Sequence, residues 1–115
     1  MFNNARAQKR WQLIAALRVF DQKSGAVVGH LFDVTTEGIR LISEQAFVTE
    51  REYQLQMHTE DESKDNTIAL NARSIWSKED INPNFYDTGF QLIDVSAETK
   101  SYLAHLIDEL KATQT

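Results

Sequence analysis

The stretch G-A-V-V-G-H-L-F-D-V-T-T-E-G-I-R-L-I-S, residues 25–43, decides the fold because it contains two strand-forming runs around a turn. In the first run Val27 and Val28 are β-branched, which favours an extended backbone. The second run, 38–43, alternates apolar and other residues at the period of a strand. Between them D-V-T-T-E-G, 33–38, consists largely of residue types that favour turns for local reasons. This pattern predicts a pair of antiparallel strands.

Further strand patterns lie on both sides of this pair. We expect strands at 13–20, 25–33, 38–43, 53–57, 68–76 and 85–93. The first two are joined by a turn at 21–25, and the acidic segment 60–66 forms a solvated connection. In the fifth strand Trp76 shares a phase with Ile68, Leu70 and Ala72, which predicts packing in the core or at its rim. Six strands in hairpin succession predict a mainly β fold, an antiparallel barrel.

The apolar period becomes helical after Ser96. The residues at this period are Tyr102, Leu103, Leu106, Ile107 and Leu110. Ser96 suits an N-cap, and Glu98 and Lys111 suit the two ends of the helix dipole. We therefore expect a C-terminal helix at 97–112 that plugs or flanks the barrel.

The composition fits one domain: the chain has 115 residues, of which 42% are hydrophobic. It contains no cysteine, as is typical of a reducing cytoplasm. No apolar run approaches the roughly 20 residues that span a bilayer, and the N-terminal residues lack the apolar segment of a secretion signal. We expect a soluble, cytoplasmic protein.

Charge is distributed unevenly along the chain. The net charge is −5, yet all 17 acidic residues follow position 20. Residues 1–11 are polar and basic, with Arg6, Lys9 and Arg10, and we expect them to form a flexible arm on a domain at 12–115. An acidic body disfavours broad binding to DNA or RNA, whereas a short basic arm suits a small anion.

The arginine pair and the turn at 33–38 together predict a phosphate-rich guanine ligand. Guanidinium groups pair with phosphate oxygens or with the O6/N7 edge of guanine, and they stack on bases. Arg6 and Arg10, spaced R-x-x-x-R, supply these cations. Asp33 supplies an acceptor for guanine N–H groups, and Thr35 supplies a hydroxyl.

Arg6, Arg10, Asp33, Thr35 and Gly38 resemble the R-x-x-x-R and [D/N]-x-S-x-x-G pattern of PilZ domains, bacterial receptors for cyclic di-GMP. The resemblance covers nearly the whole chain, in a single-domain form, and Thr35 stands where the family usually has serine. It implies a split six-stranded β-barrel that holds cyclic di-GMP on its outer face, with the arginine arm wrapping around the ligand.

By this resemblance, Arg6 and Arg10 contact guanine edges and phosphates, while Asp33 and Thr35 receive one guanine. Gly38 provides either a backbone angle or a close approach that a side chain would forbid. Lys9, Trp11 and Arg40 are secondary candidates, although Trp11 also suits capping of the barrel end and Arg40 an ordinary surface position. The implied output is a change of arm conformation that signals to an effector protein, or through self-association, in control of motility, biofilm or virulence.

An enzyme, an interaction adaptor and an RNA-binding barrel are the alternatives to a nucleotide receptor. No catalytic nucleophile–base pair, glycine-rich phosphate loop or metal-ligand spacing is present, so we expect neither an enzyme nor a cofactor or metal. Some PilZ-like proteins bind no nucleotide and act as pilus or motility adaptors. A small barrel that binds single-stranded RNA through Trp11 and the basic arm is the third alternative.

Overall fold

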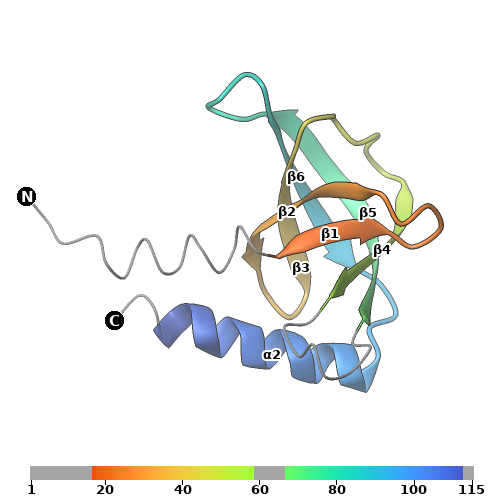
Figure 1. Ribbon diagram of the computed structural model, residues 1–115, viewed down its shortest axis with the longest axis vertical. Helices are drawn as coiled ribbons and strands as arrows, with labels where there is room; N and C mark the ends of the chain where they lie inside the picture. The colour runs from red at the N-terminus through yellow and green to blue at the C-terminus, as the bar shows by residue number, and fades with distance from the viewer. Residues whose placement is uncertain (1–16, 59–66, 113–115) are drawn as a thin grey trace, which may run out of the picture.

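The computed structural model describes residues 17–58 and 67–112, in which six antiparallel strands close into a barrel (Figure 1). The strands are β1 (Arg18–Asp21), β2 (Val27–Val34), β3 (Gly38–Ser43), β4 (Glu52–His58), β5 (Thr67–Glu79) and β6 (Tyr86–Leu92). Their order around the barrel is β1-β2-β3-β6-β5-β4, and pairing of β1 with β4 closes the ring. Closure gives each of these strands a neighbour on both sides. The antiparallel barrel expected from the sequence is confirmed.

The strand boundaries follow the sequence pattern closely. β3 has the expected bounds, and the bounds of β2, β4 and β6 differ from the expected ones by one or two residues. β5 is longer than expected and reaches Glu79. The expected first strand is seen from Arg18, and residues 13–16 lie outside the described part of the chain.

Apolar side chains from alternate strand positions fill the barrel. In β5, Ile68, Leu70, Ala72 and Ser74 are buried and the residues between them are exposed. The largest fully buried apolar side chains are Val19, Leu31, Leu41, Leu55, Met57, Leu70 and Leu103. Burying one such side chain stabilises a fold by about 1.5 to 3 kcal/mol, so these positions hold the barrel in one register.

β-Bulges interrupt the alternation in β2 and β5. The β2–β3 register shifts at Phe32, and the β5–β6 register shifts at Ile75. A bulge inserts one residue without a partner, so two consecutive side chains can share a face. Phe32 and Asp33 thereby both lie outside the barrel, as do Ile75 and Trp76. The expectation that Trp76 shares the inward phase of β5 is therefore wrong.

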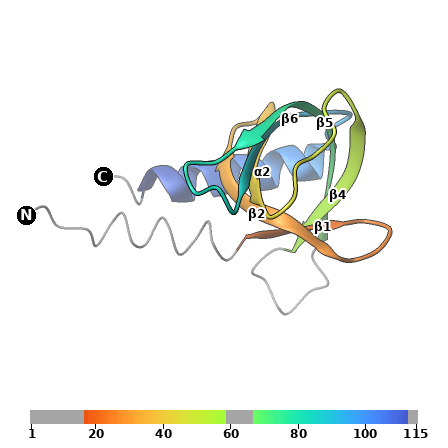
Figure 2. The same ribbon diagram turned by 90° about the horizontal axis from the view of Figure 1, so that it is seen from above.

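The helix α2 (Ala97–Ala112) lies across one end of the barrel (Figures 1 and 2). The Ser96 hydroxyl caps it by accepting a hydrogen bond from the Thr99 N–H at 3.1 Å, as its N-cap pattern predicted. Leu103, Leu106 and Leu110 join the core. The Thr99 hydroxyl donates to the Ala69 carbonyl of β5 at 3.3 Å, which fixes the first turn against the barrel. No helix within residues 17–58 and 67–112 is both long and apolar enough to cross a membrane.

Candidate functional site

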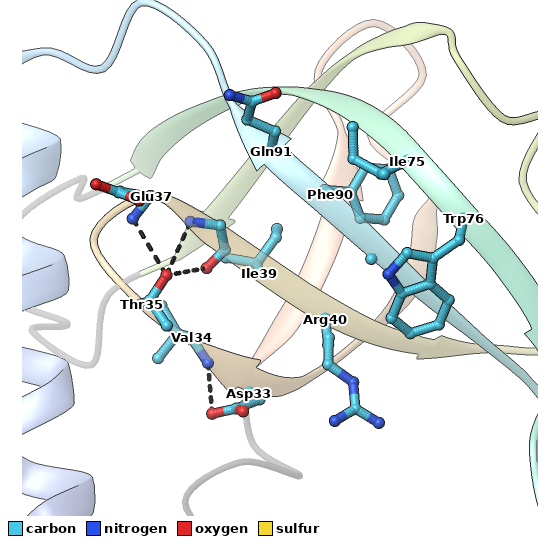
Figure 3. Close-up of a pocket in the computed structure, with 12 residues that line it drawn as sticks. Asp33, Val34, Thr35, Glu37, Ile39, Arg40, Ile75, Trp76, Phe90 and Gln91 are labelled. Atoms are coloured by element: carbon cyan, nitrogen blue, oxygen red, sulfur yellow. Dashed lines mark hydrogen bonds between the residues drawn. The ribbon is translucent and has the colours of Figure 1, made fainter.

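A pocket of about 350 Å³ opens on the outer face of the barrel, over β2, β3, β6 and β5 (Figure 3). This volume lies within the roughly 300 to 1,000 Å³ that is usual for small-molecule sites. The pocket is lined by Asp33, Val34, Thr35, Glu37, Gly38, Ile39, Arg40, Ile75, Trp76, Gly89, Phe90 and Gln91. It therefore combines polar groups of the β2–β3 turn with an apolar wall from β5 and β6.

The two bulges set the two sides of this pocket. The bulge at Phe32 turns Asp33 outward on β2, and the bulge at Ile75 turns Trp76 outward on β5. β3 and β6 lie between these strands and form the floor. An acidic acceptor and an indole ring thus face a common space from opposite edges of a four-stranded surface.

The Thr35 hydroxyl organises the turn between β2 and β3 (Figure 3). Its oxygen accepts hydrogen bonds from the Gly38 N–H at 3.0 Å and the Glu37 N–H at 3.2 Å, and it donates to the Gly38 carbonyl at 3.3 Å. The Thr35 N–H also donates to the Gly38 carbonyl, at 2.8 Å. A serine hydroxyl could make the same bonds, so threonine is compatible with this turn.

The half-buried Asp33 carboxylate is held by the backbone through one oxygen. Its Oδ1 accepts the Val34 N–H at 2.9 Å. Within the described residues, Oδ2 has no hydrogen-bond partner. An oriented carboxylate with one oxygen available can accept N–H groups of a ligand.

Two glycines allow close backbone packing at the floor of the pocket. A Cβ at Gly38 would lie 2.7 Å from the Phe90 carbonyl oxygen, and a Cβ at Gly89 would lie 2.5 Å from the Trp76 ring. Gly38 is not in the left-handed region, so close approach, and not an unusual backbone angle, explains the glycine there. The Trp76 ring lies directly on the β6 backbone because Gly89 has no side chain.

Arg40 points out of β3 between Asp33 and Trp76 (Figure 3). Its Nε and Nη2 donate to the two carboxylate oxygens of Asp87 on β6, at 3.3 and 2.5 Å. The Arg40 Cζ lies 4.8 Å from the centroid of the Phe32 ring and 5.8 Å from that of Trp76. The hydrogen bonding that Arg40 donates to the Asp87 carboxylate is the main cause that raises the pKa of Arg40, with smaller contributions from the charges of Asp87 and Asp33, against an opposing effect of burial.

The structure brings together the predicted residues of the D-x-T-x-x-G motif. Asp33, Thr35 and Gly38 lie on one pocket with the secondary candidate Arg40. The predicted residues Arg6, Lys9, Arg10 and Trp11 lie outside the described part of the chain.

Sequence reasoning missed Trp76 and Asp87. The neighbouring bulky pair Ile75–Trp76 after a regular alternation was the available signal for Trp76, whereas its place opposite Gly89 follows only from the strand register. Nothing in the sequence marked Asp87, whose role depends on cross-strand contact with Arg40. Among the described residues, no group of three or more potential metal ligands is present.

A closed six-stranded barrel with an outer-face pocket beside the D-x-T-x-x-G turn defines a class of small β-barrel domain. The chain matches the family model of the PilZ domain over residues 4–109, and it belongs to that family. No curated protein sequence matches it.

Solved structures share this fold. MotI/DgrA, the inhibitor of motility of Bacillus subtilis, has a TM-score of 0.70 and 13% identity over 86% of this chain and 48% of its own length. YcgR of Escherichia coli, solved in complex with c-di-GMP, has a TM-score of 0.62 and 14% identity over 84% of this chain and 41% of its own. The PilZ domain of YcgR with c-di-GMP gives 0.63 and 14% over 84% of this chain and 82% of that domain. The chain thus spans less than half the length of the first two proteins.

Proposed function

We propose that this protein is a receptor for cyclic di-GMP, without a catalytic step of its own. The observation that carries the proposal is the placement of Asp33 and Trp76 on opposite sides of one pocket, next to the turn organised by Thr35. Membership of the PilZ family and the fold shared with a PilZ domain bound to c-di-GMP support it.

One guanine of the ligand fits the two sides of this pocket. The Asp33 carboxylate accepts N–H groups of the base edge, and the Trp76 ring offers a stacking surface. Stacking of a base on an aromatic side chain contributes about 1 to 3 kcal/mol. Thr35 and Gly38 contribute by holding the turn, because the Thr35 hydroxyl already bonds within it.

The charge of the pocket supports a proposal in which residues outside its described lining bind the ligand's phosphates. Among its described lining residues, the acids Asp33 and Glu37 outnumber the one base, Arg40, which is paired with Asp87. The two phosphates of the ligand and the carboxylates of the pocket are all negative and repel one another. Such a ligand therefore needs cations from outside the described pocket lining. Arg6 and Arg10 supply them in this proposal, with Lys9 as a further cation, and Trp11 is available to stack on a base.

The ligand signals by drawing the N-terminal arm, residues 1–11, onto the barrel. A ligand shifts such an equilibrium only through contacts that differ between the two states, and Arg6 and Arg10 provide those contacts. When it lies on the barrel, the arm presents a new surface to an effector protein or to a second copy of the chain. The receptor acts in the cytoplasm in this proposal.

Isothermal titration calorimetry with cyclic di-GMP tests the proposal. We expect saturable binding, and we expect Arg10→Ala to weaken it about tenfold to a hundredfold, because charge-assisted hydrogen bonds contribute about 1.5 to 3 kcal/mol each. The matched control is Arg51→Ala, which removes an exposed arginine outside the pocket. No heat with the unaltered protein would instead favour the nucleotide-independent adaptor, and unchanged affinity of Arg10→Ala would remove that residue from the site.

A further inference from the structure

Arg40 is the one basic residue among the described lining of the pocket. Its guanidinium contacts the Asp87 carboxylate and lies near two aromatic rings. It forms a two-point ion pair with Asp87 at 3.3 and 2.5 Å. The Asp87 side chain is only 6% exposed, whereas that of Arg40 is 40% exposed. The inner edge of the guanidinium is thus buried against β6, and its remaining edge reaches the pocket.

Arg40 cannot leave Asp87 without leaving a buried carboxylate unpaired. Breaking a buried pair on one side is strongly unfavourable, because the remaining charge has lost its water and gained no partner. The pair therefore stays intact when a ligand binds. Paired with Asp87, Arg40 adds little net positive charge to the pocket, and a phosphate gains less from it than from a solvated arginine.

Two aromatic rings also restrict the orientation of the guanidinium. Its Cζ lies 4.8 Å from the Phe32 centroid and 5.8 Å from the Trp76 centroid. Nε and Nη2 are engaged with Asp87, and Nη1 has no hydrogen-bond partner among the described residues. A guanidinium has five N–H groups, so the two on Nη1 and the second one on Nη2 remain for a ligand. The contacts with Asp87 hold these remaining donors in a fixed direction beside the ring on which a base would stack.

We infer that Arg40 is a specificity-determining residue that reads the O6/N7 edge of a guanine, and that Asp87 is the residue that positions it. This inference rests on the proposed function. A fixed fork of N–H donors matches the two acceptors on that edge of guanine, whereas adenine presents an N–H donor in place of O6. The phosphates are left to other cations.

A 7-deazaguanine analogue of cyclic di-GMP tests the inference, because it keeps the phosphates and O6 and removes only N7. We expect the unaltered protein to bind the analogue about three- to tenfold more weakly than cyclic di-GMP. The variant Arg40→Gln/Asp87→Asn, which removes both charges together, should bind the two ligands equally. Arg40→Lys, which keeps the charge but not the fork, should do the same and serves if the double variant does not fold. Arg51→Gln is the control that keeps the full preference.

The salt dependence of binding supplies a second readout. The slope of log affinity against log salt concentration should be unchanged in Arg40→Gln/Asp87→Asn, whereas loss of a phosphate contact would reduce it. The inference is overturned if the variants keep the preference for cyclic di-GMP over the analogue, or if the slope falls. Absence of any binding by the unaltered protein would overturn the proposed function and this inference together.

Discussion

The Thr35 hydroxyl acts within its own turn. It accepts two backbone N–H groups and donates to the Gly38 carbonyl, so its contribution to the proposed ligand site is the shape of the turn that follows Asp33. This explains how threonine can stand where serine is usual in the motif. The methyl group that distinguishes the two residues takes no part in these bonds.

Replacing Thr35 tests this role. Thr35→Val keeps the shape of the side chain but leaves the Gly38 and Glu37 N–H groups without their acceptor. We expect a loss of about 1 kcal/mol of unfolding free energy, which lowers the melting temperature by about 4 to 8 °C, and weaker binding of cyclic di-GMP. Thr35→Ser should match the unaltered protein in both. Equal behaviour of the two variants in thermal unfolding would show that the hydroxyl is dispensable.

Gly38 is expected to tolerate no side chain. A Cβ there would lie 2.7 Å from the Phe90 carbonyl oxygen, a backbone atom that moves only if β3 and β6 separate. We expect Gly38→Ala to reduce the free energy of unfolding by about 1 to 3 kcal/mol in urea denaturation, and to weaken ligand binding. Gly25→Ala is the comparison: Gly25 has a φ of 73° but open space around it, far from the pocket lining. It should lower stability and leave affinity unchanged, and a Gly38→Ala protein with full affinity would contradict the role of the close approach.

Among the structural elements, the strands and the helix were largely predictable from the sequence, and the bulges were not. Periodic burial reveals both kinds of element: apolar residues recur every second position in a half-buried strand and every three or four positions in an amphipathic helix. A bulge depends on which residues pair across strands, so its local signature is weak: for β5 it was only the bulky pair Ile75–Trp76 after a regular alternation. Trp76 was for this reason assigned to the inward phase of β5, whereas the bulge at Ile75 turns it to the pocket.

The local motif of the site was predictable from the sequence, and its cross-strand contact was not. Asp33, Thr35 and Gly38 lie within six residues of each other, and a local motif reveals them. Asp87 lies 47 residues after Arg40 in the chain, and only the pairing of β3 with β6 brings the two together. Contacts of this kind require the register of the sheet to be known.

The turn between β1 and β2 provides a prediction on pH. The Asp21 Oδ2 accepts the Ser24 N–H at 3.0 Å, and this backbone hydrogen bond is the main cause that lowers the pKa of Asp21. A lowered pKa in the folded state means that the carboxylate stabilises the fold above its unfolded pKa, and that this contribution is lost as pH falls through the lower folded value. NMR titration should find Asp21 below its ordinary pKa. A pKa at or above that value would contradict the hydrogen bond from the Ser24 N–H to the Asp21 carboxylate.

The whole molecule combines an acidic body with a basic N-terminal segment. The described pocket carries two acids and one paired base, and the three cations expected to meet the phosphates lie at positions 6, 9 and 10. Neither part is complete for a doubly charged nucleotide. Ligand binding is therefore expected to depend on both, and to weaken as salt screens their attraction.

A titration of isotopically labelled protein with cyclic di-GMP, followed by NMR, tests this account most directly. We predict saturable shifts of the Thr35 and Gly38 amides and of the Trp76 indole N–H, together with the amides of Arg6 and Arg10. Signals from β4, on the opposite side of the barrel from β3, should move little. Spectra that stay unchanged with the ligand in excess, or shifts confined to surfaces away from this pocket, would contradict the assignment of a cyclic di-GMP site between Asp33 and Trp76.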